Sequence, residues 1–179
     1  MWVAVVGALA TVAAAVALVA PLGGGDGRSN YPYPVQKFAD QGRDHIPPGQ
    51  VYNGYNSNPP TSGPHSSQAA NWGVSESELP KEVPVHNMEH GGVVVWYNCD
   101  GGPAPLDATA CQLLHTQLAS VVRANLARRK LVLMTPYSHM PSRIALTAWR
   151  TLDAFDEFDQ ARVQAFIDAF ERKFNPEGF

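Results

Sequence analysis

The sequence predicts an α+β fold: a small mixed β-sheet with two main helices, wrapped by a proline-rich N-terminal segment and preceded by an N-terminal transmembrane helix. Three observations carry this prediction. The chain begins with a long stretch free of charged side chains, and ten of its 15 prolines lie between residues 21 and 84. Beyond that segment, short β-branched runs alternate with two amphipathic stretches. The 179 residues allow one ordinary domain plus an anchor.

Residues 1–22 predict a signal-anchor that stays in the membrane. Their side chains are apolar or small, and about 20 such residues span a bilayer. A cleaved signal peptide is the alternative, but no basic residue precedes the apolar stretch and Pro21 follows the small residues where cleavage would occur. We therefore expect a linker over residues 23–34 and an extracytoplasmic domain over residues 35–179, held at the cell membrane by a single pass.

The proline-rich segment, residues 21–84, shows no helical periodicity over more than a turn. We expect it to form ordered loops over the core, because it carries too many large apolar side chains for a solvated tail. Such loops commonly carry functional sites. The large apolar residues are Tyr31, Tyr33, Phe38, Val51, Tyr52, Tyr55 and Trp72.

The remaining residues supply the sheet and the helices. Val93–Tyr97 is β-branched and aromatic, which predicts a buried strand. An apolar stripe in Leu106–Arg129 predicts a helix, and Leu131–Pro136 predicts a second strand, parallel to the first through a right-handed crossover. Arg143–Trp149 is expected to form a third strand in a hairpin with the second, and Asp159–Phe174 a second amphipathic helix.

The two cysteines, Cys99 and Cys111, are expected to form a disulfide. In an exported protein an even number of cysteines at short separation favours this pairing. A thiolate metal site is the alternative, but it would require clustered cysteine and histidine, and Cys99 lies nine residues after His90 across a strand. The disulfide in turn supports an extracytoplasmic domain.

The charge of the chain argues against nucleic acid as a partner. The net charge is −3, and Lys and Arg are scattered apart from one short group at 128–130. A nucleic-acid interface would show a basic stripe with interleaved aromatic residues.

The segment from His86 to His90 concentrates possible metal ligands. It matches the H-x-x-E-H pattern of inverted zinc proteases, in which a helix presents both histidines and the glutamate acts on metal-bound water. Here Pro84 precedes the segment and Gly91-Gly92 follows it, so we do not expect a helix long enough to present the pair. A straight strand would separate the histidines by roughly 13 Å, and only a turn would bring them together.

Histidine together with methionine favours copper, particularly Cu(I), whereas histidine with carboxylate and water favours zinc. We therefore predict copper as the cofactor, with zinc as the less favoured ion. The alternative is that the histidines are separately hydrogen-bonded structural residues. Glu89 or a backbone carbonyl is expected to orient a ligand histidine. The candidate ligands are His45, His65, His86, Met88, His90, His139 and Met140.

Several motifs resemble the bacterial family catalogued as domain of unknown function 3105. The likeness covers roughly residues 35–178 and its motifs are specific. They are His45–Gly49, Pro59–His65, Val85–Tyr97, Pro136-Tyr137 and Leu146–Trp149.

The resemblance implies a membrane-anchored exported protein and brings no established activity. It places His45, His65, His86, Glu89 and His90 on the marked positions of the family. Met88 stands where the family usually has leucine, and His139-Met140 is not a clear family feature. These departures weaken the thioether part of the copper argument and leave the histidines.

Three functions follow as hypotheses. The first is a membrane-anchored extracytoplasmic metal-binding domain, most concretely for copper, with His65, His86 and His90 as direct ligands and a role in metal handling or redox chemistry. The second is a non-catalytic accessory subunit of a larger membrane complex. The third is a zinc-dependent hydrolase with Glu89 as general base.

Overall fold

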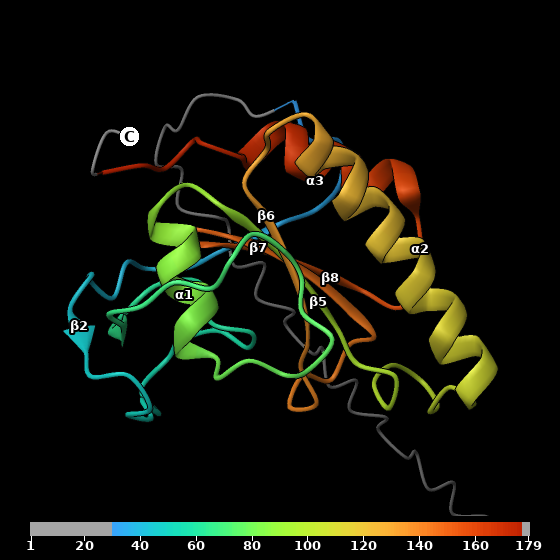
Figure 1. The fold of residues 1–179 in the computed structure, drawn as a ribbon, viewed down its shortest axis with the longest axis horizontal. Helices are drawn as coiled ribbons and strands as arrows, with labels where there is room; N and C mark the ends of the chain where they lie inside the picture. The colour runs from blue at the N-terminus through green and yellow to red at the C-terminus, as the bar shows by residue number, and fades with distance from the viewer. Residues whose placement is uncertain (1–29, 177–179) are drawn as a thin grey trace, which may run out of the picture.

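The computed structural model describes residues 30–176 and shows an α+β fold with a mixed sheet (Figure 1). The predicted anchor and most of the predicted linker lie outside these residues. The elements are β1 (Gln36–Lys37), β2 (His45–Ile46), β3 (His65–Ser66), β4 (Gly73–Val74), α1 (Glu82–Glu89), β5 (Val93–Tyr97), α2 (Ala108–Ala127), β6 (Val132–Pro136), β7 (Ile144–Ala148), β8 (Thr151–Phe155) and α3 (Gln160–Phe170).

The main sheet has the strand order β1-β8-β7-β5-β6-β4. β5 and β6 are parallel and joined by α2, as the crossover prediction requires, and β5 pairs with β7 in antiparallel register. The predicted hairpin between the second and third strands is wrong, because β7 instead pairs with β5 and with the unpredicted strand β8. Arg150 turns the chain between β7 and β8 with a left-handed φ of 61°, which is uncommon for a residue other than glycine, and the sequence carries no glycine to mark this turn.

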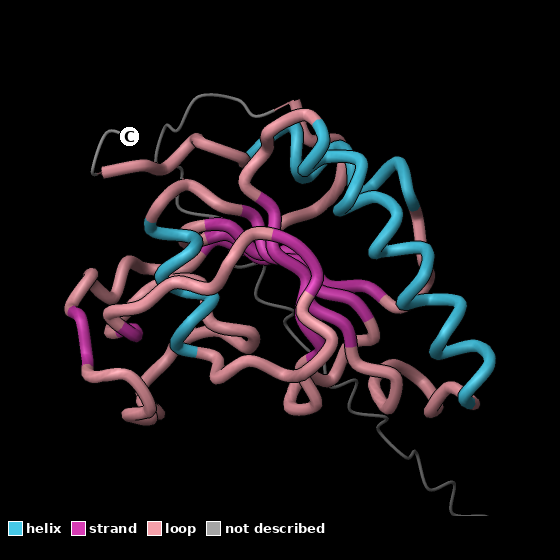
Figure 2. Tube along the Cα trace, in the orientation of Figure 1, coloured by secondary structure: helices cyan, strands magenta, loops and turns pink. Residues whose placement is uncertain are grey.

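Side chains of β5 alternate between two hydrophobic clusters on opposite faces of the sheet, as the period of a strand dictates. Val93 and Val95 pack in the cluster that contains the apolar faces of α2 and α3. Val94 and Trp96 pack in the second cluster, together with residues of α1. Figure 2 shows α2 and α3 on one side of the sheet and α1 on the other.

The N-terminal segment wraps the sheet as ordered loops with short paired strands. β1 adds to one edge beside β8, and β4 adds to the other edge beside β6. β2 and β3 pair with each other in a separate two-stranded parallel sheet, which lies against α1. The described part of this segment therefore covers the α1 side of the molecule and brings loop residues close to that helix.

Cys99 and Cys111 form the predicted disulfide, with Cα atoms 5.5 Å apart. The bond joins the loop after β5 to the first turn of α2. Asp107 caps the same helix, since its side chain accepts a hydrogen bond from the backbone N–H of Ala110 at 2.8 Å. Within residues 30–176, no helix is both long and apolar enough to cross a membrane.

Candidate metal centre

The segment containing His86 and His90 is helical, contrary to the expectation from sequence. Pro84 lies in the first turn of α1, where its missing N–H is no loss because that group has no partner within a helix. Gly91, with φ of 82°, ends the helix. The N–H of Gly91 donates to Met88 O and that of Gly92 to Asn87 O, both at 3.0 Å, which is the Schellman arrangement.

The helix separates possible ligands from core residues. Successive residues are rotated by about 100° in an α-helix, so His86 and His90 share one face while Met88 lies almost opposite His86. Met88 is fully buried in the cluster with Val94. The Nε2 atoms of His86 and His90 are 2.8 Å apart.

The loop histidines reach this helix through the small two-stranded sheet. His45 of β2 and His65 of β3 are direct register partners, and the N–H of His65 donates to Asp44 O at 2.9 Å. The rings of His45 and His86 are stacked, with centroids 5.0 Å apart and planes inclined by 6°. Pairing of two strands that are distant in the sequence therefore assembles the site.

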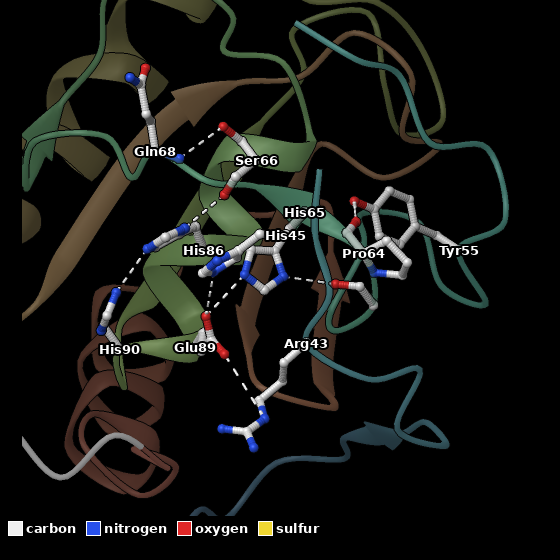
Figure 3. Close-up of polar contacts among 11 residues, drawn as sticks. Arg43, His45, Tyr55, Pro64, His65, Ser66, Gln68, His86, Glu89 and His90 are labelled. Carbon is white, nitrogen blue, oxygen red and sulfur yellow. Dashed lines mark hydrogen bonds and ion pairs between the residues drawn. The ribbon is translucent and has the colours of Figure 1, made fainter. Parts of the chain in front are cut away.

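Together these elements form a cluster of three histidines and one carboxylate that could hold a metal ion. One donor atom from each of His45, His65, His86 and Glu89 lies within 4.8 Å of the others. Glu89 Oε2 is 3.0 Å from His65 Nε2 and 3.3 Å from His45 Nε2 (Figure 3). His65, His86 and Glu89 are buried, whereas the side chain of His45 is 44% exposed.

Backbone carbonyls determine which ring nitrogens of two histidines carry hydrogen. His65 Nδ1 lies 2.8 Å from Gly63 O, and His86 Nδ1 lies 2.7 Å from Ser66 O. A carbonyl oxygen only accepts hydrogen bonds, so each Nδ1 is the donor. In the neutral rings the lone pair is then on Nε2, which lies 3.0 Å from Glu89 Oε2 in His65 and 2.8 Å from His90 Nε2 in His86. Histidines that bind metals have this arrangement, with the other ring nitrogen donating to a carbonyl or carboxylate.

The cluster needs a positive charge between its acceptors. Glu89 is 2% exposed, and burial of an unpaired carboxylate costs several kcal/mol. With Nδ1 of His65 as donor, Nε2 meets Glu89 Oε2 favourably only through a proton or a metal ion. Arg43 contributes at longer range, with Nε 3.9 Å from Glu89 Oε1.

Burial lowers the pKa of His86; the hydrogen bond to the Ser66 carbonyl opposes this effect, and the neighbouring His65, His90 and His45 each add a smaller lowering. The shift favours the neutral imidazole, which is the form that binds metals.

The other predicted ligands do not gather at this cluster. Met140 is buried in the hydrophobic cluster that also holds Met88, and the side chain of His139 is 75% exposed, with Nε2 4.0 Å from Glu78 Oε1. His90 contacts the cluster through His86. Glu89 has a more direct place than predicted, since it is one of the four grouped residues.

Sequence reasoning missed several residues that support the site. Arg43 contacts Glu89, and the carbonyls of Gly63 and Ser66 orient two histidines. Asn87 bonds the backbone of Ala70 in both directions, accepting from its N–H at 3.0 Å and donating to its O at 2.9 Å. Asn87 lies between the two histidines of the motif, and this position in the sequence is the signal that could have identified it as a residue of the site.

Comparison with known proteins identifies a family whose function is unknown. A model of the family described as protein of unknown function (DUF3105) matches residues 47–178. The match includes β3 and α1, while His45 lies just before its start. No curated protein and no solved structure matches the chain. Because the family model spans well over half of the 179 residues, the chain belongs to the DUF3105 family of proteins of unknown function.

Proposed function

We propose that this protein binds a single divalent transition-metal ion through His45, His65, His86 and Glu89. The observation that carries the proposal is the orientation of His65 and His86. Each directs Nδ1 to a backbone carbonyl, which leaves the lone pair of the neutral ring on Nε2, and both residues belong to the group of four whose donor atoms lie within 4.8 Å of one another. Three imidazoles and one carboxylate satisfy the four-coordinate preference of zinc.

Zinc is the ion that this donor set favours, and copper is the second candidate. The preference for copper from sequence depended on methionine sulfur, and both methionines are packed in the apolar cluster of the sheet. Imidazole nitrogen also binds Cu(II), and the affinity of a given site for Cu(II) is generally higher than for Zn(II). Ligand geometry and metal availability, more than affinity, decide between the two ions. The carboxylate in the group is a hard ligand and makes Cu(I) the least suitable ion.

The role we propose for this metal binding is metal handling at the cell surface. The charge-free residues at the start of the sequence support a membrane anchor, and the disulfide between Cys99 and Cys111 supports an oxidising compartment outside the cytoplasm. The partial exposure of His45 supports exchange of the ion with solvent or with another carrier, because one ligand is accessible while the other three are enclosed.

Metal titration of the purified full-length protein tests the proposal. Zn(II) and Cu(II) are each titrated against the parent protein, His65→Ala and the control His139→Ala, which changes an exposed histidine beside Glu78. We expect saturation at one ion per chain for the parent and the control, and at least tenfold weaker binding for His65→Ala. Equal binding by all three proteins would contradict the assignment.

A zinc-dependent hydrolase is a second candidate, favoured by the helical form of the H-x-x-E-H motif. α1 presents His86 and His90 on one face, as this motif requires, and their Nε2 atoms are 2.8 Å apart. Glu89 would then act as general base on metal-bound water. Chelator-sensitive hydrolysis of an ester or peptide panel that disappears in Glu89→Gln while zinc stays bound would favour this function over metal handling.

A further inference from the structure

A cavity of about 300 Å³ lies beside the histidine cluster, lined by Ala69, Trp72, His90, Leu131 and Arg172. His90 connects the two features, because it lines the cavity and its Nε2 lies 2.8 Å from that of His86. The volume is at the lower end of the range of small-molecule sites. A molecule in this cavity would therefore be small and would lie one imidazole away from the cluster.

The indole of Trp72 forms a fixed apolar wall. A Cβ atom at Gly92 would lie only 2.4 Å from the ring, which shows that the indole lies directly against the glycine backbone. Leu131 adds apolar surface, and its N–H donates to Glu171 Oε1 at 3.1 Å. These contacts indicate a cavity formed before any ligand enters.

Arg172 supplies the positive charge of the cavity. Its backbone adopts a left-handed φ of 58°, and its N–H donates to Gly91 O at 2.8 Å. The guanidinium is held by Glu171, with Nε 3.2 Å from Oε1, and by a long bond of 3.4 Å from Nη2 to Arg129 O. A guanidinium has five N–H donors in a fixed fork, so donors remain for a ligand beyond these described contacts.

We propose that this cavity binds a small organic carboxylate with an aromatic or other apolar body. The carboxylate pairs with Arg172, for which a two-point contact is the preferred geometry, and the body packs against Trp72 and Leu131. The inference rests on the proposed function in one respect: the carboxylate is a substrate or co-ligand of the neighbouring metal centre. Binding in the cavity itself requires only the residues that line it.

Phenylacetate is the probe, and acetate is the control for simple coordination to the metal. Zinc-loaded full-length protein is titrated with each, and binding is measured by calorimetry and by the NMR signal of the Trp72 indole N–H. We expect saturable binding of phenylacetate at least tenfold tighter than that of acetate, with a shift of the Trp72 signal. Absence of saturable binding, or equal affinity for both anions, would overturn the proposal.

Two variants separate the cavity from the metal centre. Arg172→Gln is expected to weaken phenylacetate binding at least tenfold without loss of zinc. The control Arg150→Gln changes an exposed arginine with a similar φ of 61° and should bind as the parent does. Unchanged binding by Arg172→Gln would refute the cavity alone. Phenylacetate binding by protein that takes up no zinc would refute the metal centre and leave the cavity supported.

Discussion

His65 and His86 come from different elements and share one arrangement: each places Nδ1 against a backbone carbonyl, Gly63 O at 2.8 Å and Ser66 O at 2.7 Å. The carbonyls belong to the same short stretch of chain around β3. A single loop therefore fixes the ring orientation of two histidines. The lone pair of each neutral ring is then on Nε2, which lies beside Glu89 in His65 and beside His90 in His86.

Glu89→Gln should weaken metal binding without unfolding the protein. The substitution preserves shape and removes the negative charge that offsets the ion. We expect affinity to fall at least tenfold, which corresponds to about 1.4 kcal/mol. Metal titration measures the change. Glu78→Gln is the control because it removes the same charge from a glutamate outside the cluster, which contacts His139 and the N–H of Ser138. Equal loss in both variants would show a general effect of charge.

Gly91→Ala should destabilise the protein more than Gly49→Ala. Both glycines have left-handed φ, 82° and 84°, so each substitution carries a cost of about 1–2 kcal/mol. A Cβ at Gly91 would also lie 2.9 Å from Phe174 O, whereas no atom lies within 4 Å of one at Gly49. Urea unfolding of the two variants measures the difference. Equal stabilities would contradict the close contact at the end of α1.

Tyr55→Phe should reduce the loss of stability at alkaline pH. The Tyr55 hydroxyl donates to Pro64 O at 2.6 Å, next to His65 (Figure 3), and burial, followed by Glu82 and neighbouring tyrosines, raises its pKa. The unfolded chain releases this proton near pH 10, while the folded protein retains it. The contribution of Tyr55 to the free energy of unfolding is therefore complete below pH 10 and declines as the pH rises above it.

Unfolding by urea at pH 8 to 11 measures this effect in the parent and in Tyr55→Phe. The parent should lose stability more steeply above about pH 10 than the variant does. Parallel curves would mean that Tyr55 has the same pKa in the folded and unfolded states.

Replacing Cys99 and Cys111 together by serine should lower the free energy of unfolding by about 3 kcal/mol. The two residues are separated by 12 positions, and the estimate comes from the entropy of closing a loop of that size. Equilibrium unfolding of both proteins gives the value. The histidine cluster lies on the α1 side of the sheet, opposite α2, so metal affinity should not change. A coupled loss of metal would contradict this separation.

The sequence predicts the strands β5, β6 and β7 and the two helices that cover one face of the sheet, but it pairs β7 with the wrong neighbour. Val93–Tyr97 has the bounds of β5, and the parallel crossover through α2 follows from alternating strand and helix patterns. The strand β8 has no such signal, because Thr151–Phe155 mixes an aspartate and small residues with only a few apolar side chains. Its place in the sheet comes from pairing with β7 and β1.

The candidate site shows why local patterns mislead. Pro84 and Gly91-Gly92 appeared to exclude a helix, yet proline in the first turn and glycine after the last turn are signals of helix boundaries. His45 and His65 could be predicted only as candidates, because their meeting depends on β2 pairing with β3 across about twenty residues of loop. Met88 and Met140 were predicted as metal ligands because methionine sulfur binds copper. Only the packing of the folded protein shows that both belong to the hydrophobic core.

Elemental analysis by mass spectrometry tests the central claim most directly. Full-length protein without a histidine tag is purified from an oxidising compartment, alongside the variant with His65→Ala and His86→Ala. The account predicts a single zinc or copper ion per parent chain and none in the variant. An absence of metal in both proteins, with no uptake after addition of either ion, would contradict it and leave the histidines as structural residues.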